Sequence, residues 1–179
     1  RYENTDSYSN ILYIKEDAGE LSYLAYKTFN NDKYRPETCC VVGNYYSLKG
    51  EHEKAIMYFK RAIKLDRNFL SAWTLMGHEY LETKNAPAAI EAYRTAVDVN
   101  PNDYRAWYGL GQTYELYLMH NYALHYFTNA ALSRPNDSRM WNALAKCYER
   151  LNNTVEAKYC NERAELHHDR EGIVLHQLA

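Results

Sequence analysis

Small and apolar residues recur along the chain with a fixed period of 34 positions. The small residue stands at Ser9, Gly43, Gly77, Gly111, Ala145 and Ala179. Four positions earlier a tryptophan recurs, and three positions later a tyrosine; sixteen positions later the chain has Phe59, Tyr93 and Phe127. A period of this length indicates stacked helix-turn-helix units, because one such unit cannot bury its apolar face alone.

Spacings of three and four within each period place the large residues on one helical face, where they are expected to fill the space between helices. The small residue and two later alanines permit close approach of the paired helices. Asn100-Pro101 and Arg134-Pro135 predict ends of second helices, since the residue before proline avoids the helical region. Gly50 fits a left-handed cap, and Asn85 fits an N-cap ahead of Pro87.

The period predicts four full repeats, at residues 36–69, 70–103, 104–137 and 138–171. Residues 2–35 form a degenerate repeat, and residues 172–179 are expected to begin a truncated one. Because the chain begins at Arg1 and ends on apolar residues, we interpret it as a piece of a longer array. The large-large-small-aromatic pattern resembles the tetratricopeptide repeat. It implies an all-α solenoid of helical hairpins, wound as a right-handed superhelix.

Composition excludes several classes of function. The formal net charge is −2, with 21 basic and 23 acidic residues, which gives no basic face for nucleic acid. The sequence has no apolar stretch near the roughly 20 residues of a membrane span. It also has no nucleophile-base pair and no phosphate-binding glycine loop. We therefore expect a protein that is not an enzyme, needs no cofactor, and contacts neither nucleic acid nor membrane.

The cysteines and histidines give no metal site. Cys39, Cys40, Cys147 and Cys160 lack ligand spacing and are expected to be free, mostly buried thiols. Residues 167–169 (His-His-Asp) are expected in a loop, where other repeats have proline, and adjacent residues seldom ligate one ion.

The concave groove is therefore the candidate binding site. In tetratricopeptide superhelices the first helix of each repeat lines this groove. The repeat positions, together with Glu79 beside His78 at the groove edge, predict a binding set of Asn44, Ser47, Thr74, His78, Glu79, Arg105, Tyr108, Gln112, Glu115 and Asn142. Recurring hydrogen-bonding groups at these positions suit an extended peptide. The first half of the groove is acidic and the second half brings Arg105 and Arg139, so a basic ligand residue is expected in the first half.

Residues between the periodic positions carry a closer resemblance. The runs YRPETCCVVGNYYSL (34–48), WTLMGHEY (73–80), DYRAWYGLGQTYE (103–115) and RPNDSRM (134–140) are similar to subunit eight of the anaphase-promoting complex, the cell-division-cycle twenty-three homologue. The resemblance implies a non-catalytic scaffold subunit of a ubiquitin ligase, found in the nucleus and cytoplasm. Other subunits of the complex would be its partners, and the family's homodimer forms mainly through N-terminal repeats that this chain lacks.

The resemblance also implies a ligand, the arginine-containing C-box peptide of a co-activator. Asn44 and Glu79 match the positions where the family's groove would meet that arginine. One alternative is a co-chaperone-type adaptor that clamps a C-terminal carboxylate, but Cys40 and Leu75 stand where that clamp needs Lys and Asn. Another is a purely structural role through the convex face, which is compatible with peptide binding.

Overall fold

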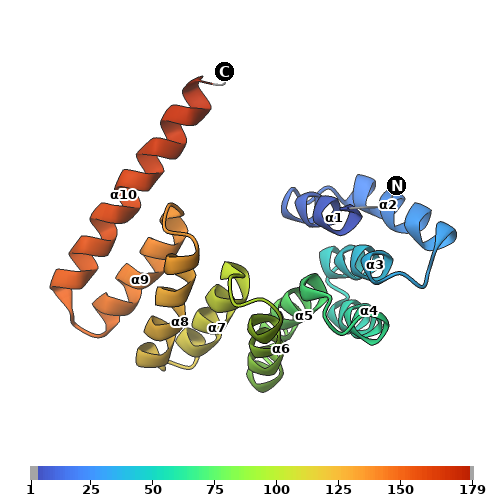
Figure 1. The fold of residues 1–179 in the computed structure, drawn as a ribbon, viewed down its shortest axis with the longest axis horizontal. Coiled ribbons are helices and arrows are strands. Elements are labelled where there is room, and N and C mark those ends of the chain that lie inside the picture. The colour runs from blue at the N-terminus through green and yellow to red at the C-terminus, as the bar shows by residue number, and fades with distance from the viewer. Residues whose placement is uncertain (1–3, 178–179) are drawn as a thin grey trace. The chain divides into compact units, whose positions relative to one another are not determined.

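The computed structural model describes the backbone of residues 4–177 and the side chains of residues 4–167. Within that range the chain forms ten helices and no strand (Figure 1). The helices are α1 (Thr5–Ile14), α2 (Ala18–Asn31), α3 (Pro36–Leu48), α4 (His52–Leu65), α5 (Leu70–Glu82), α6 (Ala86–Val99), α7 (Tyr104–Leu116), α8 (His120–Ser133), α9 (Ser138–Arg150) and α10 (Thr154–Gln177). These helical hairpins confirm the all-α tetratricopeptide architecture. None of the described helices is long and apolar enough to cross a membrane.

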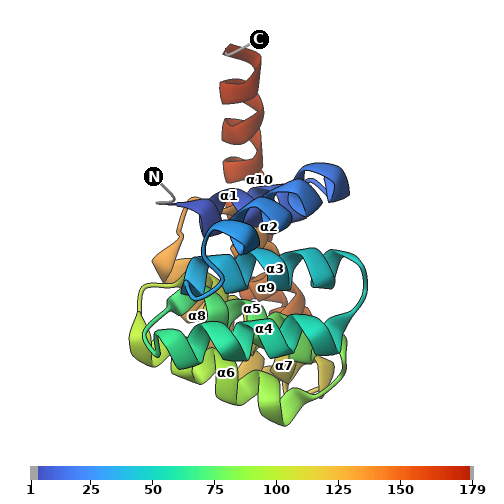
Figure 2. The same cartoon turned by 90° about the vertical axis from the view of Figure 1, so that its right-hand side faces the viewer.

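Contacts divide the chain into two compact units, Arg1–Val99 and Asn100–Ala179. In the first unit the helices pair as α1 with α2, α3 with α4, and α5 with α6, and Figure 2 shows α3 and α4 lying side by side. Its core contains the fully buried side chains of Phe59, Leu21 and Val41. In the second unit α7 pairs with α8 and α9 with α10, around Phe127, Leu110 and Met140.

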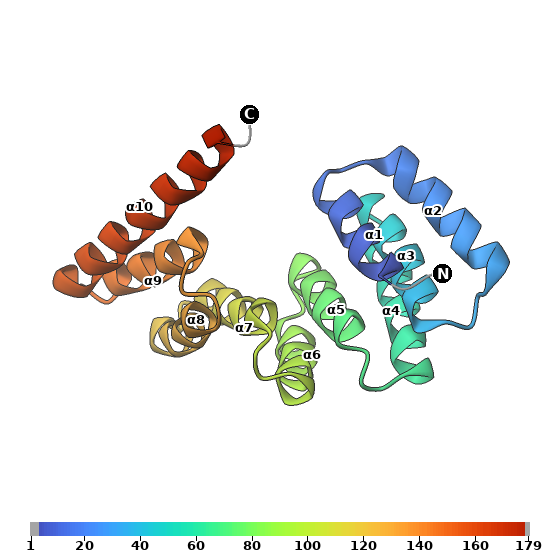
Figure 3. The same cartoon turned by 45° about the horizontal axis from the view of Figure 1, so that its top comes forward.

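The last helix corrects one sequence-based expectation. α10 runs without a break from Thr154 to Gln177 and extends well past α9 (Figure 3). The predicted loop at residues 167–169 and the predicted new helix from Gly172 are therefore wrong within the described range. The physical reason is that Asp169 stands where earlier repeats have Pro101 and Pro135, so nothing forces the helix to end there. Ala179, the last member of the period, lies outside the described residues.

The glycines of the period let an aromatic ring lie against the helix backbone. A Cβ atom at Gly111 would be 2.5 Å from ring carbons of Phe127, and one at Gly77 would be 2.7 Å from the ring of Tyr93. Gly43 has the same relation to Phe59. Distances below 3.0 Å are too short for real Cβ atoms. The small residue is thus required by the ring sixteen positions later.

The tryptophans fix each hairpin to the turn before it. The indole Nε1 of Trp107 donates to the carbonyl of Pro101 at 2.7 Å, and that of Trp141 donates to the carbonyl of Pro135 at 2.7 Å. Trp73 makes the same bond to the carbonyl of Arg67. Each tryptophan therefore packs its ring against the core and satisfies its one polar group locally.

The turn inside each hairpin uses a left-handed residue at one repeat position. Its members are Glu16, Gly50, Lys84, Leu118 and Asn152, with φ between 55° and 74°. The sequence predicted this conformation only for Gly50, which the structure confirms, as it confirms Asn85 as an N-cap that accepts from the amide of Ala88. Glycine and asparagine tolerate this region, whereas a leucine there is strained.

Replacing Leu118 with glycine is expected to raise the free energy of unfolding of the second unit by about 0.5–1 kcal/mol. Relief of left-handed strain, roughly 1–2 kcal/mol, outweighs the greater freedom of glycine in the unfolded chain. Little packing is lost because the Leu118 side chain is 73% exposed. Urea unfolding followed by circular dichroism measures the change. Asn152→Gly at the equivalent turn is the control and should change stability little; an equal gain in both variants would contradict the strain at Leu118.

Candidate functional site

The first helices of the three hairpins in the first unit, together with His52 at the start of α4, share a cluster of polar side chains. We call this the α1–α3–α5 cluster; it comprises Asp6, Ser9, Asn10, Tyr13, Asn44, Ser47, His52, Ser71, His78 and Glu79. The repeat brings equivalent positions together. Asn44 bonds to Asn10 and Ser47 lies 3.2 Å from the Tyr13 hydroxyl, each pair being 34 residues apart.

Asn44, on α3, is hydrogen-bonded to two residues of α1. Its side chain is buried, and Nδ2 donates to Asn10 Oδ1 at 2.7 Å and to Ser9 Oγ at 2.9 Å. A third link runs from Ser71 Oγ to Asp6 Oδ2, at 3.1 Å. These bonds connect α1 to both α3 and α5, so the cluster fixes the relative positions of the three helices.

Glu79 is the buried charge of the cluster, with 2% of its surface exposed. Its Oε1 accepts from the Ser47 hydroxyl, and its Oε2 lies 2.8 Å from His52 Nδ1. His78 Nδ1 lies 3.9 Å from Oε1 on the solvent side. Burial would raise the pKa of Glu79, but the nearby His78 ring and the hydrogen bonds from Ser47 and His52 together lower it. The nearby Glu79 carboxylate raises the pKa of His78 against the effect of burial.

The structure places the predicted residues of the first unit at different depths. Asn44, Ser47 and Glu79 were expected to line the groove surface, but their side chains are buried and hold one another and α1. Thr74 is half-buried and donates to the carbonyl of Leu70, and His78 is exposed. These side chains are buried because α1 packs closely over α3. The degenerate repeat at residues 2–35 did not predict so close a contact. Contact of these residues with a peptide stays a prediction.

Six members of the cluster were not in the predicted binding set: Asp6, Ser9, Asn10, Tyr13, His52 and Ser71. Two of them show why. His52 is the first residue of α4, next to the Gly50 turn, and belongs to no periodic position that marked the groove. Tyr13 was hidden because it lies in the degenerate repeat. Its signal was present, since Tyr13 is 34 residues before Ser47 and so occupies the same repeat position.

In the second unit the two predicted arginines are engaged at helix starts. Asp137 caps α9 by accepting from the Arg139 amide at 3.0 Å, and it also accepts from Arg139 Nε at 3.0 Å and Nη2 at 2.6 Å. Asp103 holds Arg105 in the same way, with Nε at 2.9 Å. The bonds from Arg139 lower the pKa of Asp137. Both guanidinium groups are therefore clamped by their own N-cap carboxylates.

The other predicted residues of the second unit are partly packed. Tyr108 lies on α7 with its ring 5.3 Å from the ring of Phe127, and burial raises the pKa of its hydroxyl. Gln112 and Glu115 are half-buried on the same helix, and Asn142 is exposed on α9. Their binding role stays a prediction.

The four cysteines are buried free thiols, as expected. Burial raises the pKa of Cys147 to about 11, which leaves its thiol protonated at neutral pH and unreactive. Among the residues whose side chains are described, no three His, Cys, Asp or Glu side chains converge to hold a metal. The side chains of His168 and Asp169 lie outside the described residues.

Comparison with known families agrees with the repeat pattern. Models described as tetratricopeptide repeat match residues 36–69 and 122–164, and one described as TPR repeat matches residues 77–116. Together they extend over most of residues 36–164.

Curated relatives match about half of the chain. "Anaphase-promoting complex subunit 8" of Arabidopsis thaliana is 68% identical over 88 residues, and the protein of that name from Dictyostelium discoideum is 62% identical over 89 residues. "Anaphase-promoting complex subunit CDC23" of Saccharomyces cerevisiae is 53% identical over 91 residues. The matches cover 49–51% of this chain and 14–15% of these relatives.

Solved structures share the fold at low sequence identity. A chain of the "APC/C hetero-tetramer Cut9-Hcn1" superposes with a TM-score of 0.82 at 19% identity, covering 90% of this chain and 31% of that one. MamA superposes with a TM-score of 0.76 at 22% identity, covering 92% and 96%. The chain therefore belongs to the tetratricopeptide-repeat family, and about half of it is homologous to subunit 8 (CDC23) of the anaphase-promoting complex.

Proposed function

We propose that the chain is part of a non-catalytic scaffold subunit of the anaphase-promoting complex, active in the nucleus and cytoplasm. The observation that carries the proposal is the 53–68% identity to proteins named subunit 8 or CDC23. A tetratricopeptide solenoid supports such a role, because its stacked hairpins offer long surfaces to other subunits. The partners are other subunits of the complex and the C-box peptide of a co-activator.

Within this function, the α1–α3–α5 cluster receives an arginine of the co-activator peptide. Glu79 supports this assignment because it is a carboxylate whose neighbours donate hydrogen bonds but bring no fixed positive charge. A guanidinium group that replaced the His52 and His78 contacts would form a charge-assisted bidentate pair, which histidine cannot. Both histidines are near enough to solvent to move, with side chains 36% and 46% exposed.

The co-chaperone alternative receives less support from the geometry. A carboxylate clamp needs basic side chains that are free to reach a ligand. Arg105 and Arg139 are each bonded through the guanidinium group to Asp103 or Asp137. These carboxylates neutralise the charge that a C-terminal carboxylate would seek.

A titration of the chain with a fluorescent synthetic C-box peptide tests the proposal. We expect binding in the micromolar range, weakened by about tenfold or more in Glu79→Gln, since a charged pair is replaced by a neutral one. Asn44→Ala is expected to weaken it as well. The same peptide with its arginine changed to alanine should bind the wild type as poorly as the normal peptide binds Glu79→Gln.

Glu53→Gln on α4, an exposed carboxylate outside the cluster, serves as the matched control and should leave affinity unchanged. Thermal unfolding of each variant separates lost binding from lost folding. Unchanged affinity in folded Glu79→Gln and Asn44→Ala would reject this site.

A further inference from the structure

The second helices α4 and α6 leave a hollow between them in the first unit. Both helices pack against α5, and three residues of α5 line the hollow as its floor: Trp73, Met76 and Tyr80. Lys60 of α4 and Ala88 of α6 line it from opposite sides. Its volume of about 380 Å³ falls within the range of about 300–1,000 Å³ for ligand pockets. The hollow therefore has room for a side chain of another molecule.

The sequence period explains why the hollow exists. Tyr80 occupies the same repeat position as Tyr46 and Tyr114. In the α3–α4 hairpin the ring of Tyr46 is stacked on the ring of Tyr58, with centroids 5.5 Å apart. In the α7–α8 hairpin the ring of Tyr114 is stacked on the ring of Tyr126 at 5.2 Å. The hairpins before and after α5–α6 thus cover this tyrosine with a second aromatic ring.

The α5–α6 hairpin lacks that second ring. Where α8 has Tyr122 and Tyr126, the equivalent positions of α6 hold Ala88 and Ala92. Among the described side chains, no aromatic ring stacks on Tyr80. The hollow therefore occupies the space of the missing tyrosine, and an aromatic ring that enters it meets the same stacking surface that the neighbouring hairpins use.

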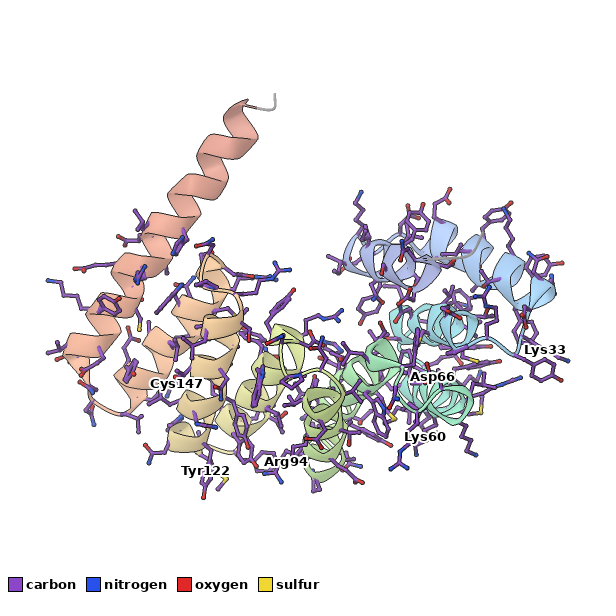
Figure 4. All side chains as sticks on the ribbon, in the orientation of Figure 1. Lys33, Lys60, Asp66, Arg94, Tyr122 and Cys147 are labelled. Carbon is purple, nitrogen blue, oxygen red and sulfur yellow. The ribbon has the colours of Figure 1, made fainter. Side chains whose placement is uncertain are left out.

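The α4 side of the hollow is positively charged. Residues 60–67 contain four basic residues and one acidic residue, although the chain as a whole has a net charge of −2. Lys60 extends from α4 on the side away from α3 (Figure 4), with Nζ 5.8 Å from the centroid of the Tyr80 ring. Among the residues whose side chains are described, neither Lys60 nor Lys64 forms an ion pair. Like charges four positions apart weakly destabilise a helix, so this pair does not serve folding.

We propose that this site, the α4–α6 hollow, binds an aromatic side chain of a partner protein whose adjacent carboxylates meet Lys60 and Lys64. The ring replaces the missing tyrosine, and the carboxylates supply the charge that the lysines lack. Glu91 lines the hollow from α6 and repels carboxylates there, which directs them to α4. A nucleic-acid base would also stack on Tyr80, but single strands are bound along a longer positive groove. Here Glu53 and Glu91 lie beside the lysines and interrupt such a groove.

A titration of the isotope-labelled chain with the peptide Glu-Glu-Phe-Glu-Glu, followed by NMR, tests the proposal. We expect shifts of backbone amides in α4, α5 and α6, with a dissociation constant of about 0.1 mM. Lys60→Glu should raise this constant about tenfold, because it reverses the charge that meets the carboxylates. Lys27→Glu on α2 is the matched control and should leave it unchanged, since Lys27 Nζ lies 5.6 Å from the Tyr23 ring in a similar exposed setting. The peptide Glu-Glu-Gly-Glu-Glu should bind about tenfold more weakly than the phenylalanine peptide.

Ala88→Tyr tests the aromatic part of the proposal without changing any charge. It restores the ring that α8 carries at this repeat position, where Tyr122 stacks on Tyr114 at 5.4 Å. The variant should fold as stably as the wild type and bind the phenylalanine peptide about tenfold more weakly, because its own ring fills the hollow. Ala88→Ser leaves the hollow open and should bind like the wild type. Thermal unfolding of each variant separates lost binding from lost folding.

Three results would overturn the proposal. One is a wild-type chain that does not bind the phenylalanine peptide at millimolar concentration. Another is equal affinity of the wild type and folded Ala88→Tyr, or of the phenylalanine and glycine peptides. The third is an oligouridine that shifts the same amides and binds more tightly than the peptide, which would assign the surface to nucleic acid.

Discussion

Phe127→Ala is expected to lower the free energy of unfolding of the second unit by about 3–5 kcal/mol, the range for deleting a buried aromatic side chain. The Phe127 ring is completely buried between α7 and α8, against Gly111 and Tyr108. Its loss removes the contacts of the whole ring and leaves a cavity that the two rigid helices cannot close. Chemical denaturation of wild type and variant measures the difference.

Gly111→Ala probes the same contact from the other side. On its own it should cost about 1–3 kcal/mol, because the new methyl group overlaps the Phe127 ring. In the Phe127→Ala background the methyl group has space, so the double variant should be no less stable than Phe127→Ala alone. The expected coupling is thus about 1–3 kcal/mol.

Leu132→Ala on the same helix is the control, since Leu132 is 74% exposed and its truncation should cost less than about 0.5 kcal/mol. Additive effects of Gly111→Ala and Phe127→Ala would contradict the proposed packing, as would a cost for Phe127→Ala close to that of Leu132→Ala.

This coupling explains why much of the fold could be predicted from sequence. Glycine occupies the small position where a ring follows sixteen residues later, as at Gly43, Gly77 and Gly111. Where the ring is absent, at Ala25 and Asn161, the small residue is Ser9 or Ala145 instead. The steric fit between the two helices therefore appears in the sequence as a glycine and an aromatic residue sixteen positions apart. This spacing is what allows the hairpins to be predicted.

Features that depend on one residue rather than on the period were not predictable in the same way. The left-handed turns at Lys84 and Leu118 are imposed by the packing of the two helices, against the preference of the residues themselves. α10 continues past Asp169 because no proline ends it at that position. The absence of a helix-ending residue predicts a boundary less clearly than its presence does.

The candidate site was predictable in part. Repeat positions placed Asn44 and Ser47 in the groove and Glu79 beside His78 at its edge, and the structure joins these residues in one cluster. Their burial could not be deduced, because it depends on α1, whose repeat lacks the usual markers. The charge distribution along the sequence was a poor guide to the second half of the groove. Arg105 and Arg139 suggested a basic surface there, but each arginine is paired with an aspartate two residues earlier.

Glu79→Ala is expected to cost about 3 kcal/mol of stability in the first unit, because it leaves the groups that donate to the buried carboxylate without their acceptor. Ser47 and His52 both lose their acceptor. Glu79→Gln, which can still accept from Ser47, should cost less, about 1–2 kcal/mol. Glu82→Ala on the same helix, with a side chain 53% exposed, is the control and should cost no more than about 0.5 kcal/mol.

The cost of Glu79→Ala should also depend on pH. Because the pKa of Glu79 is lowered in the folded chain, its contribution is complete above its unfolded value of about 4.3 and is lost as pH falls further. The pKa of His78 is raised, so its contribution is complete below about 6.5 and is lost as pH rises through the folded value. Urea unfolding across pH should therefore show the largest difference from wild type between about pH 4.3 and 6.5. A difference that keeps increasing toward pH 8 would mean that His78 does not stabilise the Glu79 carboxylate.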